Sequence, residues 1–65
     1  MAKYPNITVK LVGEDGNAFF ILGKCQRAMK EAKIPQEEVD NFIKEATSGN
    51  YDHLLSTCVN WFNIR

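Results

Sequence analysis

Apolar and polar residues alternate near the start of the chain, and apolar residues then recur every three or four positions. Ile7, Val9 and Leu11 fall on one side of the alternating run. This pattern, with its β-branched residues, is typical of a strand that is buried on one face. We therefore predict a first strand from Ile7 to Val12. The following Gly13–Asn17 segment predicts a sharp turn, in which Asp-Gly readily adopts a positive φ.

The helical period begins directly after this turn. Asn17 is a suitable N-cap, and the pattern predicts a helix from about Ala18 to Lys33. Ile34 and Pro35 interrupt it, because proline is tolerated in a first helical turn but not in a helix interior. The inner face of this helix is formed by Ala18, Ile21, Leu22, Cys25, Ala28, Met29 and Ala32.

Two further helices and an ambiguous tail complete the chain. The second helix has the apolar positions Val39, Phe42, Ile43 and Ala46. We expect Gly49 to end it in the left-handed conformation. Asn50 caps a third helix, whose predicted inner face is Tyr51, Leu54, Leu55 and Cys58. Residues 61–65 suit either the end of this helix or a short strand. We favour a strand from about Phe62, because a lone first strand leaves both of its edges unpaired.

These elements predict an α+β fold in the order β-α-α-α-β, with three helices packed on one face of a minimal two-stranded sheet. The 65 residues, of which 45% are apolar, form a single domain over 1–65 with a thin core. Residues 1–33 carry six basic and three acidic side chains, whereas residues 34–65 carry two and five. The net charge of zero argues against a strongly nucleic-acid-binding or membrane-surface protein.

The cysteines and the N-terminus favour a cytoplasmic protein. Cys25 and Cys58 are far apart in the sequence, and a chain with two cysteines is not a disulfide scaffold, so we interpret both as reduced thiols. The first residues lack the apolar core of a secretion signal. No apolar run approaches the roughly 20 residues that a membrane-spanning helix needs.

Two stretches resemble a group of short, uncharacterised proteins of bacterial and phage type. The first is VKLVGEDGNAF, within residues 9–19, and the second is ATSGNYDHLL, residues 46–55. The likeness covers most of the chain. It implies a bacterial, phage or mobile-element origin, and it carries no activity because the group has no assigned function.

Candidate chemical sites are weak in this sequence. Gly13 and Gly16 stand where phosphate-binding loops occur, but the residues between them are Glu14 and Asp15, which repel an anion. His53 and either cysteine would form a Cys–His pair only if the helix brought them to one face, and the spacing between 53 and 58 places them on different faces. One histidine and two separated cysteines do not supply the four ligands of a zinc site. We therefore expect no catalytic, metal or cofactor site.

Two surfaces remain as candidates for binding. Lys24, Arg27 and Lys30 form a basic outer face of the first helix, with Phe20 beside them, and such a face can bind nucleic acid through phosphates and stacking. The apolar residues that exceed the capacity of a small core indicate an oligomer or partner interface. They are Val12, Phe19, Phe20, Trp61 and Phe62. The alternative is that Phe19 and Trp61 cap the ends of the core. Gly23, inside the helix, allows another backbone to approach closely.

From these surfaces we expect a small, non-enzymatic protein-interaction module, which either self-associates or binds a protein partner. A nucleic-acid-associated accessory protein that uses the basic face of the first helix is the alternative. The sequence contains no convergent nucleophile, base and orienting group, so an enzyme is disfavoured.

Overall fold

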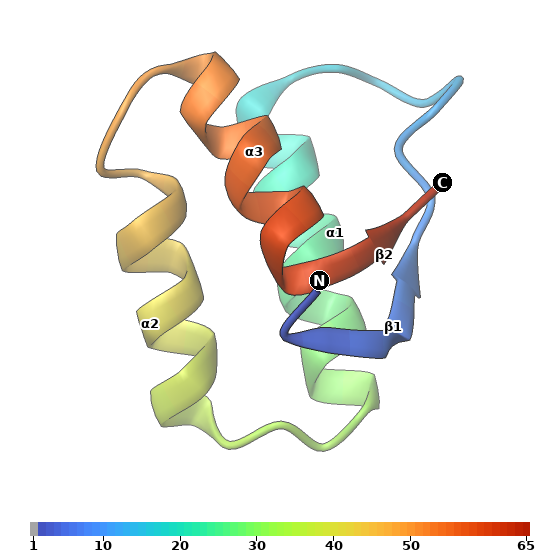
Figure 1. Cartoon of the computed structure of the whole chain (residues 1–65), viewed down its shortest axis with the longest axis vertical. Helices are drawn as coiled ribbons and strands as arrows, with labels where there is room; N and C mark the ends of the chain where they lie inside the picture. Colours follow the sequence, from blue (N-terminus) through green and yellow to red (C-terminus); the bar gives the residue numbers. More distant parts are fainter. Residues whose placement is uncertain (1) are drawn as a thin grey trace.

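The computed structural model describes residues 2–65 and has the order β-α-α-α-β (Figure 1). The elements are β1 (Tyr4–Val9), α1 (Ala18–Glu31), α2 (Gln36–Ala46), α3 (Tyr51–Trp61) and β2 (Phe62–Ile64). The predicted α+β fold class is therefore confirmed, and the tail forms a strand from Phe62 as favoured. The first and last elements of the described chain form the sheet, with three helices between them in the sequence.

The two strands are parallel neighbours and form the whole sheet of the described chain. Tyr4 pairs with Phe62, whereas Thr8 pairs with Asn63, so β1 contains an irregular segment between these two pairs. Pro5 lies in this segment, and a proline cannot donate a ladder hydrogen bond. Figure 1 shows the resulting bend in β1. The strand therefore begins three residues earlier, and ends three residues earlier, than the predicted Ile7–Val12.

The helices bury one face of the sheet and enclose a small core. Ile7 and Val9 of β1 point into this core, while Thr8 remains exposed on the other face and its Oγ1 accepts a hydrogen bond from the Asn63 side chain at 3.1 Å. The helical residues of the core occupy the predicted inner faces, and they are Ile21, Cys25, Met29, Val39, Phe42, Ala46, Leu54 and Cys58. Tyr51 departs from the prediction, because its side chain is 45% exposed and its hydroxyl donates to the carbonyl of Gly16.

Aromatic side chains form the end of the core at which α3 passes into β2. Phe42 makes edge contacts with Trp61 and Phe62, at centroid separations of 5.4 and 5.1 Å. The indole N–H of Trp61 donates to Glu45 Oε2 at 2.9 Å, which satisfies its polar group. Trp61 and Phe62 are only 5% and 1% exposed. They belong to the core, which corrects their assignment to a binding surface.

The predicted helix starts are confirmed by their capping bonds. The Asn17 side chain accepts a hydrogen bond from the backbone N–H of Phe19 at 2.8 Å, and Asn50 accepts one from His53 N–H at 2.9 Å. Each bond satisfies a backbone donor that lacks a partner within its helix. In the turn before α1, Gly13 adopts φ +80°, so the left-handed residue is Gly13 rather than the glycine of Asp-Gly.

Gly49 does not adopt the left-handed conformation that the sequence predicted, since the only glycine with positive φ among residues 2–65 is Gly13. Its role is steric. A Cβ at position 49 would lie 2.8 Å from Cβ and Cγ of His53, which folds back over the end of α2. Glycine is therefore needed here because another side chain packs against its backbone.

Candidate functional site

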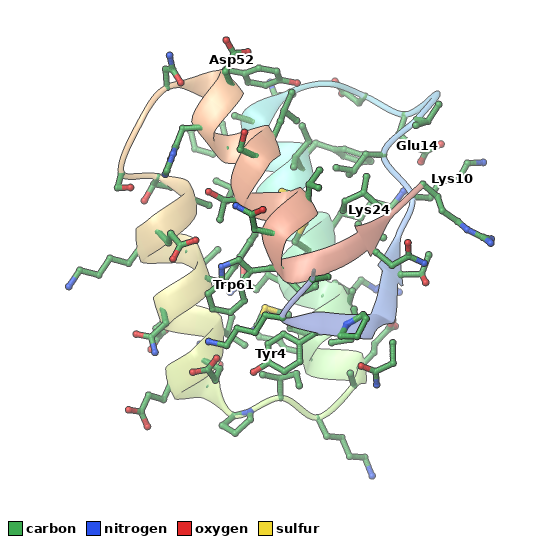
Figure 2. All side chains as sticks on the ribbon, in the orientation of Figure 1. Tyr4, Lys10, Glu14, Lys24, Asp52 and Trp61 are labelled. Carbon is green, nitrogen blue, oxygen red and sulfur yellow. The ribbon has the colours of Figure 1, made fainter. Side chains whose placement is uncertain are left out.

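A groove of about 630 Å³ lies between the outer edge of β1 and the exposed side of α1. We call it the α1–β1 groove. Thr8, Val9 and Lys10 line one side of it, and the loop before α1 contributes Glu14. The helical wall contains Phe19, Phe20, Gly23, Lys24 and Arg27. Figure 2 shows Lys10, Glu14 and Lys24 on the same side of the molecule, near the end of β1.

The groove joins parts of the two surfaces that the sequence analysis treated separately. Phe19 and Phe20 come from the proposed interaction surface, and their side chains are 85% and 40% exposed. Lys24 and Arg27 come from the proposed nucleic-acid surface. They lie beside the phenylalanines because all four project from the outer face of α1, and the Lys24 ammonium is 5.7 Å from the centre of the Phe20 ring. These four side chains therefore form one amphipathic surface, where the sequence suggested two separate ones.

Most of the positive charge in the groove has a partner. Lys24 Nζ lies 3.0 Å from Glu14 Oε1, and Arg27 Nε lies 3.5 Å from Glu31 Oε2 on the same helix. The hydrogen bond from Lys24, and then its charge, lower the pKa of the Glu14 carboxyl. The Arg27–Glu31 pair is highly exposed, with side chains 80% and 68% accessible, so it is easily exchanged for another partner. Lys10 makes no ion pair within residues 2–65.

The other predicted surface residues lie outside this groove. Val12 is 72% exposed but sits in the turn after β1 and does not line the groove. Lys30 lines an adjoining depression of about 370 Å³ together with Gly23 and Arg27. Trp61 and Phe62 are buried in the aromatic end of the core described above. The structure thus brings together four of the eight predicted residues.

Sequence reasoning did not identify Lys10 or Glu14 as parts of a site. Lys10 had no assigned role, and Glu14 was considered only as a turn residue that repels anions. The signal was present in the strand alternation, which places Thr8 and Lys10 on one side, but their position beside α1 depends on how the helix crosses the sheet. The basic residues Lys24 and Arg27 are paired by Glu14 and by Glu31 of α1 itself.

The side chains with catalytic potential are used in packing and capping. Cys25 and Cys58 are fully buried, and their sulfur atoms are 3.7 Å apart. Hydrogen bonding to Cys58, and then burial, raise the pKa of the Cys25 thiol, which disfavours a nucleophilic thiolate. His53 lies apart from them, with its Nε2 2.9 Å from the Glu45 carbonyl oxygen and 3.1 Å from Ser48 Oγ. This ring joins the end of α2 to the start of α3.

Residues 2–65 contain no group of three or more His, Cys, Asp or Glu side chains arranged to hold a metal ion. None of the described helices combines the length and the apolar character needed to cross a membrane. A functional argument can be built on the α1–β1 groove, which combines exposed aromatic and charged side chains.

Comparison with known proteins finds no match, because no family model, no curated protein and no solved structure is significantly similar to this chain. The resemblance to short bacterial and phage-type proteins stays a prediction. Function must be argued from the groove itself.

Proposed function

We propose that this protein is a small, non-enzymatic interaction module that contacts a protein partner through the α1–β1 groove. The observation that carries the proposal is the pair of exposed phenylalanines at the start of α1, with Phe19 85% and Phe20 40% accessible. Removing apolar surface from water contributes about 25 cal/mol per Å². Two aromatic rings beside a groove therefore provide a strong driving force for association.

The surroundings of these rings support a protein partner. Interfaces typically combine an apolar centre with a polar rim, and aromatic residues and arginine are enriched in them. In the α1–β1 groove, Phe19 and Phe20 supply the apolar part, while Lys10, Lys24 and Arg27 surround it. The partner is either a different protein or a second copy of the chain.

Nucleic-acid binding remains the alternative function, through Lys24, Arg27 and Lys30. The arrangement of α1 favours it less, because Lys24 and Arg27 each have a carboxylate partner and Glu14 lies in the groove. A phosphate would have to displace these carboxylates. Binding through phosphates would also weaken steeply as salt is added, which separates it from binding through the phenylalanines.

Two matched substitutions test the protein-interaction function. Phe19→Glu introduces a carboxylate at the groove, and Val59→Glu makes a similar change at an exposed apolar residue of α3, 58% accessible and outside the groove. Proteins captured from the source cell, together with the molar mass from sedimentation, should report partner binding and self-association. We expect Phe19→Glu to abolish an association that Val59→Glu retains.

The same samples decide between the alternatives. If both variants and the wild type show identical partners and identical mass, the groove is not an interaction surface. If DNA or RNA is retained at low salt and lost on Lys24→Gln and Arg27→Gln, while Phe19→Glu has no effect on protein partners, the nucleic-acid function replaces the one proposed.

A further inference from the structure

We infer that the outer edge of β1 accepts an extended, acidic peptide segment of the partner as a third strand of the sheet, seated over Gly23 of α1. The inference rests on the proposed function and names the kind of partner. It follows from a juxtaposition in the α1–β1 groove, where the free backbone edge at Thr8 and Lys10 faces a helix wall that contains Gly23.

The backbone of β1, and of Lys10 directly after it, has groups on the side away from β2 that are unpaired within residues 2–65. Arg65 N–H donates to the Val9 carbonyl at 2.9 Å, and Leu11 N–H donates to the Arg65 carbonyl at 2.6 Å. In a parallel ladder, this pattern turns the N–H and C=O of the intervening residue, Lys10, toward the opposite edge. Because residues two apart in a strand direct their backbone groups to the same side, the N–H and C=O of Thr8 also face the edge away from β2. An extended peptide can pair with such an edge through its main chain.

Gly23 gives the added strand room. It lies in the interior of α1, where glycine costs about 1 kcal/mol relative to alanine. No packing within the described chain accounts for it, since a Cβ built at position 23 meets no atom within 4 Å. The open space is the groove itself, because Gly23 lines it. A side chain at this position would fill the space between α1 and the edge of β1, so the glycine keeps that space available for another backbone.

Lys10 favours an acidic residue on the added strand, because it is the cation of the groove that lacks a carboxylate partner within residues 2–65. Arg27 is held only by its exposed contact with Glu31. Carboxylates on a paired strand would approach Lys10 from directly across the ladder, where opposite charges stabilise a pair of strands. Apolar side chains of the same peptide, at alternating positions, would face α1 and cover Phe20.

A second copy of this chain is a poorer occupant of the edge. Pairing two β1 edges would bring Lys10 of each copy close to the other, and like charges placed across strands are destabilising. An exposed lysine on an edge strand is a common protection against this kind of self-pairing. The same lysine attracts an acidic strand. Lys10 therefore disfavours pairing between two copies of the chain and favours pairing with a strand of opposite charge.

A displayed library of random short peptides, selected against the full chain, tests the inference. We expect enrichment of peptides that carry net negative charge and apolar residues at every second position. N-methylation of alternate peptide residues, which removes main-chain donors, should weaken binding about tenfold or more, as should Gly23→Leu, where tenfold corresponds to about 1.4 kcal/mol. Lys44→Leu, on the exposed side of α2, is the matched control and should bind as the wild type does.

Amide chemical shifts provide a readout that does not depend on any substitution. The N–H signals of Thr8 and Lys10 should move on binding of the selected peptide. The inference is overturned if no peptides are enriched, if the enriched peptides are basic, or if N-methylation has no effect. Binding that is lost on Phe19→Glu but is insensitive to N-methylation would overturn strand addition alone, and the proposed interaction function would stand.

Discussion

At the scale of single residues, Lys33 determines how α1 ends. It is the only non-glycine residue with positive φ in the described chain, at 62°. Its N–H bonds to the Lys30 carbonyl and the N–H of Ile34 bonds to the Met29 carbonyl, both at 3.0 Å. These two bonds form a Schellman motif, in which Ala32 is the C-cap and Lys33 takes the left-handed position that glycine usually occupies.

Replacing Lys33 with glycine should therefore stabilise the protein. The left-handed conformation costs an L-residue about 1–2 kcal/mol, and part of this gain is offset by the greater freedom of glycine in the unfolded chain. We expect Lys33→Gly to raise the free energy of unfolding by roughly 0.5–1 kcal/mol in urea titrations. Lys44→Gly, inside α2, should lower it by about 1 kcal/mol. Equal or lower stability for Lys33→Gly would contradict this account of the helix end.

Residue chemistry alone predicted some of these local features and missed others. Asn17 and Asn50 were recognisable as caps because their side chains act on backbone groups two or three residues away. The left-handed residue after α1 was not recognisable, since a lysine stands there. Gly49 was assigned the wrong role. A glycine is required at this position because the His53 side chain packs against its backbone, and not because its φ is positive.

At the scale of elements, one carboxylate connects the start of β1 to α2. Glu38 Oε1 lies 2.8 Å from Lys3 Nζ and accepts a hydrogen bond from the Tyr4 hydroxyl at 3.0 Å. The bond from Lys3, followed by that from Tyr4, lowers the pKa of the Glu38 carboxyl. Burial, followed by the bond to Glu38, raises the pKa of Tyr4. The contact joins segments that are 34 residues apart in the chain.

This contact predicts a pH dependence of stability. Because the pKa of Glu38 is lower in the folded protein, its contribution is complete above the unfolded value of about 4.3 and is lost as the pH falls through the folded value. The free energy of unfolding should decline as the pH falls below neutral. We expect Glu38→Gln to make this decline less steep. Glu37→Gln changes a neighbouring carboxylate that makes no hydrogen bond in the described chain and should leave the decline unchanged. If the free energy of unfolding depends on pH in the same way for the wild type and Glu38→Gln, the role of this contact is refuted.

The inner face of an element was predictable where the period of apolar residues alone determines it. The second helix is an example, because its core residues Val39, Phe42 and Ala46 follow the helical spacing. The first strand was misplaced because the apolar alternation begins only at Ile7, whereas the irregular segment before Thr8 accommodates a proline within β1. Phe62 was correctly assigned to a strand but incorrectly to the surface, since alternation does not reveal which face the aromatic core will cover.

At the scale of the whole molecule, the packing of α1 on α3 brings the two cysteines together. Cys25 and Cys58 lie on the inner faces of their helices, as their spacing predicted, but their contact depends on where the helices meet, which no local pattern encodes. The 3.7 Å separation of their sulfur atoms exceeds the length of a disulfide, about 2.05 Å, by a distance that small rotations can close. The same dependence on packing explains why the α1–β1 groove was not predicted as one site.

We expect hydrogen peroxide to link Cys25 and Cys58 within one chain. The two thiols lose two electrons and two protons, a sulfur–sulfur bond forms, and the peroxide is reduced to two molecules of water. Both sulfurs are buried, so the reaction should be slow in the native protein and faster at urea concentrations that open the core. Mass spectrometry should show the loss of two hydrogen atoms and a peptide pair joined through these residues, and a thiol reductant should reverse it.

The linked chain should also be harder to unfold. A bond between positions 25 and 58 closes a loop that makes the unfolded state less disordered, which contributes about 3–4 kcal/mol in the chain-entropy description. The urea midpoint should rise after oxidation of the wild type and should not rise after the same treatment of Cys58→Ser. Cross-linked dimers or sulfinic acids in place of the internal link would contradict the close approach of α1 and α3 at these residues, and with it the packing that positions the outer face of α1 against β1.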